Sequence, residues 1–530
     1  MTRMNGGQAL VRSLAAEGLR VVFGVPGAGQ YEAIDALYST PSIRYISVRH
    51  EQAASYMADG YARAGGEVAA ALVVEGPGLF NAMSGIATAY ATSSPILVVT
   101  GGHHHRKKGL ALDETAWLGP LTKWVARVQR PAEIPETVRE AFRQLRSGRP
   151  RPVAIEVPPS VFAETEEVGP VLQPAVTPGP AHCDDRAVRR AAELLIGAQR
   201  PVIWAGGGVM RANAAALVSE LADYLQIPVV TTRQGKGSIS ERHPLSLGMA
   251  EMNYRPLRDW LAARDLILVV GSSRAAAAEG QQIVKIDIDE TELARDENVL
   301  PVQGDADPVL MALNQVVATS TSPRGGIADA VQTEVASLNA ARFDPAVQLQ
   351  PQWGLMEAVH AALPDDGIVV QGMNQMGYYS RNYFRAGGPR TYLTSSSHGT
   401  LGCAYPVALG AKVAHPERAV VSLSGDGGFL YNVQELATAV QYGINAVGIV
   451  FNDNAYGNVL RAQMEEFDGH VLGTQLHNPD FVALAQSFGA RGVLAEDAAA
   501  VEMALRAAVD PEADRPTLIE VPLGMLDREF

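Results

Sequence analysis

Short apolar runs rich in β-branched residues recur along the chain, and longer stretches with helical periodicity separate them. Because the runs are apolar throughout rather than alternating, we expect strands that are buried on both faces of parallel sheets. The predicted strands are residues 21–25, 43–48, 70–74, 95–99, 201–205, 227–230, 266–270, 368–370, 419–423 and 446–450.

Two breaks divide this pattern into three parts. Residues 169–180 hold four prolines and form a stiff connector. Residues 319–326 (TSTSPRGG) are polar and turn-forming, and a helical stretch follows them. The sequence therefore predicts an α/β protein with three doubly wound parallel-sheet domains, at residues 1–168, 181–318 and 345–530.

An internal repeat relates the first predicted domain to the third. Residues 151–158 (RPVAIEVP) and 515–522 (RPTLIEVP) share six of eight positions. We expect each octet to be the final strand of its domain's sheet, and the two domains to be related copies. The alternative is that any last strand of an α/β sheet could look like this. An arrangement in which two related domains flank a different one favours a functional site between the two related domains.

Charge and composition exclude several classes of protein. The 530 residues carry a net charge of −14, which is a poor match for nucleic acid or an anionic membrane. Two cysteines, Cys183 and Cys403, are too few for a disulfide framework or a thiolate zinc site. No run approaches 18 apolar residues, and residues 1–10 lack an apolar signal segment. We expect a cytoplasmic protein without nucleic-acid or membrane partners.

The most specific motif lies in the third predicted domain. The strand at 419–423 leads into Ser424-Gly425-Asp426-Gly427-Gly428, and the strand at 446–450 is followed by residues 452–454 (NDN). An amphipathic helix is expected between the two strands. The carboxyl ends of parallel strands meet at one edge, where ligands bind. Glycines and a helix N-terminus suit a phosphate, and Asp426 suits Mg²⁺. Gly-Asp-Gly alone would be an ordinary turn.

This pair of motifs is similar to the thiamine diphosphate (ThDP)-binding motif, and the whole chain resembles the acetolactate synthase-like family. The resemblance implies a pyrimidine-binding, a central and a diphosphate-binding domain, in that order. It also implies that Mg²⁺ is held by Asp426, Asp453 and the carbonyl of Ala455. Many relatives have asparagine at position 453, so Asn452 or Asn454 remains an alternative ligand.

The other half of the cofactor site falls in the first domain. Glu51 opens the helix after the strand at 43–48, where a glutamate ordinarily only complements the helix dipole. The resemblance implies instead that Glu51 is catalytic and hydrogen-bonds N1′ of the aminopyrimidine. It also makes Leu401 the wedge between the cofactor rings, although Leu401 alone would be a core leucine. The cofactor-binding residues implied are Gly76, Pro77, Asn81, Gly372, Met373, Asn374, Gly399, Leu401, Gly425, Asp426, Gly427, Gly428, Asp453, Ala455, Tyr456, Gly457 and Asn458.

Four further positions are candidates for contact with the substrate. Glu75 stands where the family usually has a small residue, either as an extra acid/base or as a loop carboxylate. Three adjacent histidines, His103, His104 and His105, cannot all face one metal, so a zinc site is not expected. One of the three is a candidate for contact with the substrate, and we take His104 as that candidate. Glu114 or Leu110 occupies the family's glutamine position. Ala462 replaces a tryptophan of the anabolic synthases.

Departures from the family pattern affect the predicted reaction. Flavin-containing synthases carry an Arg-Phe-Asp-Asp-Arg type segment where residues 271–278 read GSSRAAAA, so we expect ThDP and Mg²⁺ but no FAD. The resemblance implies decarboxylation of a 2-oxo acid, with pyruvate favoured, followed by carboligation to a second carbonyl compound. The alternative is a non-ligating decarboxylase of the benzoylformate type.

Two other classes of protein fit less well. A dinucleotide-dependent oxidoreductase needs Gly-x-Gly-x-x-Gly, which residues 206–208 (GGG) do not provide. A non-catalytic homologue would be expected to lack Glu51. Because Glu51 and Asp426 lie in different copies, family geometry joins them across two subunits. The resemblance therefore implies a homodimer at minimum, and we expect a homotetramer.

Overall fold

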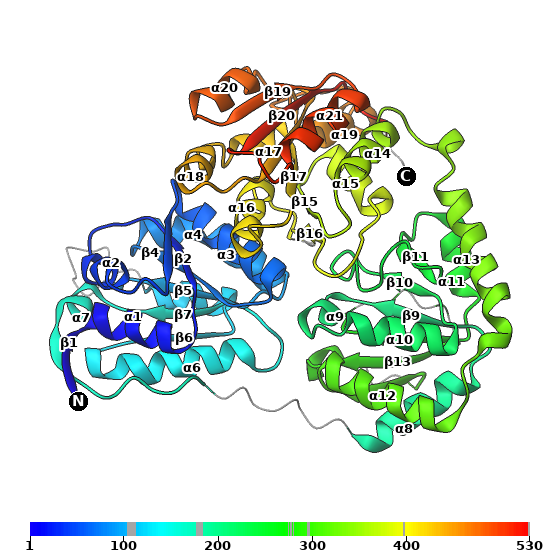
Figure 1. The fold of residues 1–530 in the computed structure, drawn as a ribbon, viewed down its shortest axis with the longest axis horizontal. Helices are drawn as coiled ribbons and strands as arrows, with labels where there is room; N and C mark the ends of the chain where they lie inside the picture. Colours follow the sequence, from blue (N-terminus) through cyan, green and yellow to red (C-terminus); the bar gives the residue numbers. More distant parts are fainter. Residues whose placement is uncertain are drawn as a thin grey trace.

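The computed structural model describes residues 1–102, 113–175, 184–273, 275, 278, 280–293, 297–395 and 398–527. The chain forms three α/β domains, each built on a six-stranded parallel sheet with helices on its faces (Figure 1). The predicted fold class is confirmed. The first domain lies at the left of Figure 1, the central domain at the right and the third domain at the top.

The first domain begins and ends with an antiparallel ribbon outside its main sheet. In this ribbon Thr2 pairs with Val168 and Asn5 with Thr165. Its strands are β1 (Thr2–Asn5), β2 (Val21–Gly24), β3 (Arg44–Ser47), β4 (Ala69–Val73), β5 (Ile96–Thr100), β6 (Trp124–Arg127), β7 (Val153–Glu156) and β8 (Thr165–Val168). Its helices are α1 (Gly6–Ala16), α2 (Tyr31–Tyr38), α3 (Glu51–Gly65), α4 (Pro77–Ala91), α5 (Glu114–Leu118), α6 (Ile134–Arg146) and α7 (Pro159–Ala163).

The central domain is followed by a long helix that packs back onto it. In that helix, α13 (Ala328–Arg342), the Arg342 guanidinium donates to the carbonyls of Leu247 and Met249. The strands are β9 (Pro201–Ala205), β10 (Val229–Thr231), β11 (Ser246–Met249), β12 (Leu266–Val270), β13 (Gln282–Asp287) and β14 (Val299–Gln303). The other helices are α8 (Asp185–Gly197), α9 (Gly207–Arg211), α10 (Ala215–Leu225), α11 (Arg255–Ala262) and α12 (Ala306–Ser320).

The third domain corrects one prediction. The single amphipathic helix expected after the Gly-Asp-Gly turn is two helices, α17 (Asp426–Leu430) and α18 (Glu435–Tyr442). The strands are β15 (Ile368–Gln371), β16 (Tyr392–Thr394), β17 (Val420–Gly425), β18 (Val447–Asn452), β19 (Arg491–Leu494) and β20 (Thr517–Pro522). The other helices are α14 (Gln352–Ala362), α15 (Gln375–Tyr383), α16 (Ala404–Ala414), α19 (Gly457–Glu466), α20 (Phe481–Ser487) and α21 (Ala498–Ala508).

The first and third sheets have the same topology. Their strand orders are β3-β2-β4-β5-β7-β6 and β16-β15-β17-β18-β20-β19, whereas the central sheet runs β11-β10-β9-β12-β13-β14. The repeated octets form β7 and β20, the last strand of each of these two sheets, at the same place in the order. This agreement supports the prediction that the two domains are related copies.

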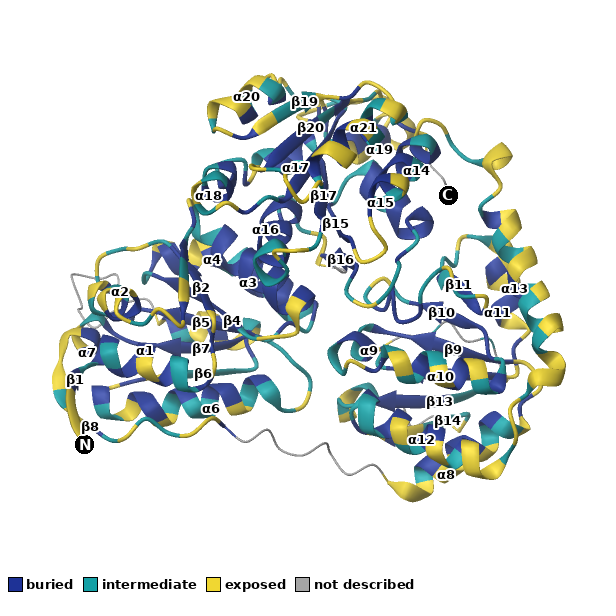
Figure 2. Ribbon diagram, viewed as in Figure 1, coloured by how far each residue is buried: buried dark blue, intermediate teal, exposed yellow. Residues whose placement is uncertain are grey.

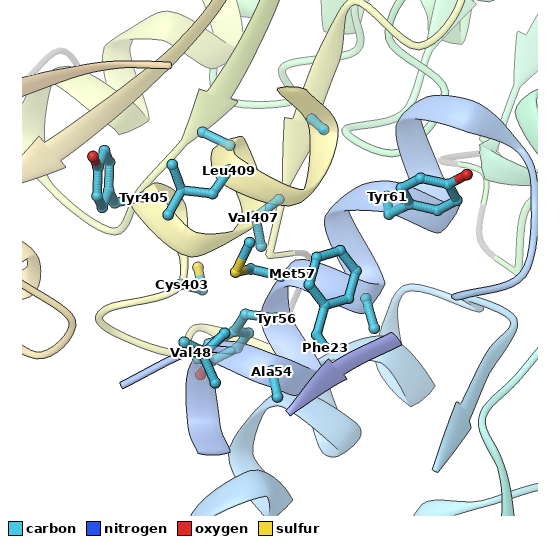
Figure 3. Packing of buried hydrophobic residues seen from close by; sticks show 14 of the residues in the cluster. Phe23, Val48, Ala54, Tyr56, Met57, Tyr61, Cys403, Tyr405, Val407 and Leu409 are labelled. Carbon is cyan, nitrogen blue, oxygen red and sulfur yellow. The ribbon is translucent and has the colours of Figure 1, made fainter. Parts of the chain in front are cut away.

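Helices α3 and α16 join the first domain to the third. A Cβ atom on Gly60 would lie 2.1 Å from the carbonyl oxygen of Val407, and one on Gly410 would lie 2.0 Å from that of Met57. The two backbones therefore approach more closely than any larger residue allows. Figure 3 shows the apolar side chains of both helices in one shared cluster.

The buried residues of each domain lie mainly in its sheet and on the helix faces that pack against it. The inner strands of all three sheets are mostly buried, whereas the edge strands β3, β6, β14 and β19 are partly exposed. Many other exposed positions lie on the outer faces of the helices (Figure 2). Within the described residues, no helix combines the length and the apolar character that crossing a membrane requires.

Candidate functional site

Two neighbouring strands of the third domain bring the predicted cofactor motifs together. Strands β17 and β18 are parallel, and Gly425 pairs with Phe451 at their carboxyl ends. Asp426 is the first residue of α17, with Gly425 at its N-cap, and Asp453 follows β18 directly. The two carboxylates thus lie at one sheet edge, as the spacing of the motifs predicts.

The environment of these carboxylates suits a divalent cation. Asp426 is buried, with 2% of its surface exposed. Burial, and then the negative charge of Asp426, raise the pKa of Asp453 to about 6. Two carboxylates that destabilise each other's charge in this way are relieved by a bound cation. No group of three or more His, Cys, Asp or Glu side chains that could hold a metal occurs in the described residues. The pair therefore needs carbonyl or water ligands, which Mg²⁺ accepts.

An amide that the sequence did not single out completes this cluster. The Asn478 side-chain amide donates to the carboxylate of Asp426 at 2.6 Å and to the side-chain oxygens of Asn452 at 2.9 Å and Asn454 at 3.3 Å. Its own side-chain oxygen is buried and has no partner among the described residues. Asn452 and Asn454, the alternative ligands, therefore contact this amide, whereas the Asp453 carboxylate accepts from Gln375 at 2.9 Å.

A cavity of about 360 Å³ opens at these side chains. All the described residues that line it belong to the third domain. Twelve of the predicted cofactor-binding residues are among them: Met373, Asn374, Leu401, Gly425, Asp426, Gly427, Gly428, Asp453, Ala455, Tyr456, Gly457 and Asn458. Lining residues that were not predicted include Gln375, Tyr431, Val459 and Leu526.

The glycines of the turn leave room for a phosphate. A Cβ atom on Gly427 would lie 2.6 Å from the Tyr456 ring and 3.0 Å from Leu476. Gly428, by contrast, faces open space, where the nearest atom would be 3.9 Å away. A side chain on Gly427 would collide with Tyr456 and Leu476, whereas Gly428 leaves room beside the first turn of α17. The glycine cradle, residues 425–428, and the carboxylate pair of Asp426 and Asp453 therefore fit a diphosphate held through Mg²⁺.

Glu51 lies in the first domain and does not line this cavity. It is the first residue of α3, and its carboxylate accepts a hydrogen bond of 3.0 Å from the Asn81 amide. Gly78 permits the close approach of the loop, because a Cβ atom there would lie 3.3 Å from the Glu51 carboxylate and 2.7 Å from Val74. Pro77 begins α4, and Gly76 precedes it with a φ of 65°, a conformation that glycine favours.

Two more carboxylates flank the same loop. Glu114 is 1% exposed and accepts from the Gly76 N–H at 2.5 Å and from the Thr100 hydroxyl at 3.2 Å. One carboxylate oxygen of Glu75 is buried without a hydrogen-bond partner among the described residues. Both substrate candidates therefore lie at the carboxyl edge of the first sheet, next to the loop that Glu51 contacts.

Other predicted residues lie apart from the cavity. Gly372 packs against β17, with its N–H donating to the Leu423 carbonyl at 2.9 Å. Gly399 is exposed, and its backbone φ of 68° lies in the left-handed region. Ala462 is half-buried on α19. His104 and Leu110 lie outside the described residues.

A buried glutamate of the third domain fixes the start of the Glu51 helix. Glu435 is fully buried on α18, and its two carboxylate oxygens accept from the Arg49 N–H at 3.1 and 3.2 Å. The Thr438 hydroxyl donates to it at 2.6 Å. Burial raises the pKa of Glu435 to about 7. Glu435 thus positions the backbone two residues before Glu51.

The titration of Glu435 predicts a pH-dependent stability. Because its pKa is about 7 in the folded protein, the folded state keeps a proton that the unfolded state releases above the usual value of 4.5. The free energy of unfolding should therefore fall as the pH rises from 4.5 to about 7. Glu435→Gln cannot titrate, so its Tm should rise relative to the wild type across this window.

Thermal unfolding at a series of pH values checks this expectation. Glu512→Gln, at an exposed position of the same domain, is the control. A Tm for Glu435→Gln that follows the wild type at every pH would contradict it.

Comparisons with known proteins agree with this architecture. Three family profiles match: the N-terminal thiamine pyrophosphate (TPP) binding domain of thiamine pyrophosphate enzymes over residues 4–123, the central domain over 188–313, and the C-terminal TPP binding domain over 372–521. The chain therefore belongs to the thiamine pyrophosphate enzymes, which use ThDP. The predicted family is confirmed.

Several relatives are similar over nearly the whole chain. A probable acetolactate synthase large subunit of Methanocaldococcus jannaschii is 35% identical and covers 92% of this chain and 87% of its own length. The acetolactate synthase isozyme 1 large subunit of Escherichia coli is 33% identical and covers 92% and 88%. A probable 2-ketoarginine decarboxylase of Pseudomonas aeruginosa is 33% identical and covers 95% and 92%. The protein is thus an acetolactate synthase-like ThDP enzyme.

Proposed function

We propose that the protein decarboxylates a 2-oxo acid, with pyruvate as the favoured donor, and joins the product to a second carbonyl compound, using ThDP and Mg²⁺. The observation that carries the proposal is the carboxylate pair Asp426 and Asp453 beside the glycine cradle in a chain of this family. The names of the acetolactate synthase relatives support carboligation.

The third domain would hold the charged end of the cofactor. Asp426, Asp453 and the carbonyl of Ala455 would bind Mg²⁺, and the glycine turn would bind the diphosphate. Leu401, which lines the same cavity, would support the rings. When bound, ThDP supplies the electron sink that decarboxylation needs and that protein side chains lack.

Glu51 would move a proton at the far ring of the cofactor. Its carboxylate would share a proton with N1′ of the pyrimidine, and the Asn81 amide would keep the carboxylate oriented at 3.0 Å. Glu75 and Glu114 lie on the substrate side of the same loop.

The test is a set of incubations of the protein with ThDP and Mg²⁺. A panel of 2-oxo acids and aldehydes is supplied, and CO₂ and condensation products are measured separately. We expect CO₂ from pyruvate together with a condensation product. CO₂ without condensation would favour the non-ligating decarboxylase, to which the name of the Pseudomonas relative also points. Absence of both products with every donor would refute the proposal.

The active site would be completed by a second copy of the chain. Every described residue that lines the Asp426 cavity is from the third domain, and Glu51 of the same chain is not among them. Exposed apolar side chains surround both half-sites: Phe80 and Trp117 near Glu51, and Tyr431 and Val459 at the cavity. A partner that pairs opposite halves would cover them.

We therefore predict a homodimer as the smallest active unit, and a homotetramer of two such dimers. Sedimentation velocity of the protein with ThDP and Mg²⁺ should show no monomer at assay concentrations. Trp117→Glu places a charge on the exposed apolar surface, and we expect it to shift the population toward inactive monomer. An active monomer would contradict the shared site.

The absence of FAD remains a prediction. The segment on which it depends, residues 271–278, includes residues 274, 276 and 277, which lie outside the described residues. We expect the purified protein to show no flavin absorbance bands, and a stoichiometric flavin spectrum would contradict this. A cytoplasmic location is also proposed, from the sequence composition.

A further inference from the structure

A second cavity, of about 280 Å³, adjoins the cofactor cavity at the junction of the central and third domains. The two cavities share Gln375, Tyr378, Asn458 and Leu526 as wall residues. Three arginines line the second cavity, Arg233 from the loop after β10, Arg381 from α15 and Arg461 from α19. Two carboxylates, Glu251 and Asp527, also line it, so positive side chains outnumber negative ones in the lining of a protein whose net charge is −14.

Two of these arginines have no counter-ion among the described residues. Arg381 is 8% exposed, and the partners of its guanidinium in the described part of the chain are weak: the Gln371 side-chain oxygen at 3.4 and 3.5 Å, the Met373 sulfur at 3.6 Å and the ring of Tyr378 at 4.6 Å. Arg233 has no hydrogen-bond or ion-pair partner within the described part of the chain. Neither forms an ion pair with a described carboxylate.

The two guanidinium groups also repel each other. Burial, and next the charge of Arg233, lower the pKa of Arg381. Glu251 lines the same cavity and offsets part of this effect, but the one hydrogen bond that its carboxylate accepts from the described residues comes from the Asn253 N–H, at 3.0 Å. A buried cation beside a like charge is unfavourable unless an anion joins it.

We propose that this cavity binds the oxyanion group, carboxylate or phosphate, of a small molecule other than the cofactor. The planar guanidinium presents paired N–H donors that match the oxygens of such a group. The volume of about 280 Å³ lies just below the usual range for ligand sites, which begins at about 300 Å³, and therefore suits a small metabolite. The inference does not depend on the proposed reaction.

The wall between the two cavities would transmit occupancy to the metal site. Arg461 donates to the side-chain oxygen of Gln375, and the Gln375 amide donates to the Asp453 carboxylate at 2.9 Å. An anion that binds the Arg461 guanidinium would compete with the hydrogen bond from Arg461 to Gln375. It would therefore change the hydrogen bond from Gln375 that orients the Asp453 carboxylate.

Calorimetric titration of the protein saturated with ThDP and Mg²⁺ tests the proposal. Inorganic phosphate and succinate are titrated separately, in a buffer without other oxyanions, so that the diphosphate site is already filled. Saturable binding of phosphate alone assigns a phosphate group, of succinate alone a carboxylate, and of both a general oxyanion site. Absence of saturable binding of either anion overturns the proposal.

Variants locate the binding in this cavity. Arg233→Met should raise the Kd of the anion at least tenfold. Because Arg233 is exposed, we expect this variant to fold as the wild type does. Arg381→Lys keeps the charge but loses the planar pair of donors, so it should weaken binding by a similar factor. Arg255→Met, at an exposed site on α11, is the matched control and should bind as the wild type does. Wild-type affinity in Arg233→Met would also overturn the proposal.

Discussion

Glu51→Gln is expected to retain ThDP binding and to lose turnover by about 10²- to 10⁴-fold, the usual contribution of a general acid–base group. Glutamine has the shape of glutamate and can still accept the hydrogen bond from Asn81, which measures 3.0 Å in the wild type. It cannot exchange a proton with a ring nitrogen at neutral pH. The loss should therefore fall on kcat and leave the cofactor affinity nearly unchanged.

The experiment measures CO₂ release at saturating pyruvate, and ThDP affinity by calorimetry on the same preparation. Glu67→Gln is a suitable control, because Glu67 lies just beyond the C-terminal end of the same helix and its side chain is 51% exposed. Turnover of Glu51→Gln within about twofold of the control would remove Glu51 from the proposed proton transfer.

The sequence predicts the layers of the fold well because each buried strand is apolar throughout. Each of the ten predicted strands overlaps an observed strand, and its two ends differ from the observed ends by at most two residues. Most of the strands that were missed, such as β6 and β19, lie at sheet edges, where β6 is only half-buried. An exception is β13, an inner strand of the central sheet whose sequence includes the charged residues Lys285 and Asp287. Edge strands face solvent on one side and carry mixed polarity, so periodicity gives a weak signal there.

The break between α17 and α18 illustrates a tertiary effect that periodicity does not reveal. The predicted single helix rests on Val433 and Leu436 at helical spacing. Asn432 is fully buried, and its amide donates to the Gly402 carbonyl at 2.8 Å and to Gln52 at 3.3 Å. A polar side chain that bonds to two other segments interrupts the helix, and nothing in the local sequence predicts this.

Some residues of the candidate site are predictable from the sequence, and others are not. Motif spacing brings Asp426 and Asp453 to one sheet edge, because parallel strands align their carboxyl ends. Asn478 carries no comparable signal. It reaches Asp426 through a backbone pairing in which the Leu476 N–H donates to the Asn454 carbonyl at 2.8 Å. That contact depends on tertiary structure, which a single sequence does not specify.

Asp426→Asn is the second substitution with a large expected effect, a loss of Mg²⁺-dependent ThDP affinity of at least about 100-fold. Loss of an outer partner of a metal ligand alone costs about 10- to 100-fold in affinity, and Asp426 would be a direct ligand. The amide keeps an oxygen that can accept from Asn478, so the fold should persist. What is lost is one of the two charges that make the cluster attractive to a cation.

Calorimetric titration of ThDP at a series of Mg²⁺ concentrations measures this loss, and far-ultraviolet circular dichroism checks the fold. Asp468→Asn is the matched control, since Asp468 is exposed and its φ of 52° is one that asparagine also tolerates. The control should keep the wild-type Mg²⁺ dependence. An Asp426→Asn protein with the same dependence would mean that the cation is held elsewhere. The glycine cradle would then bind the diphosphate without a metal at this sheet edge.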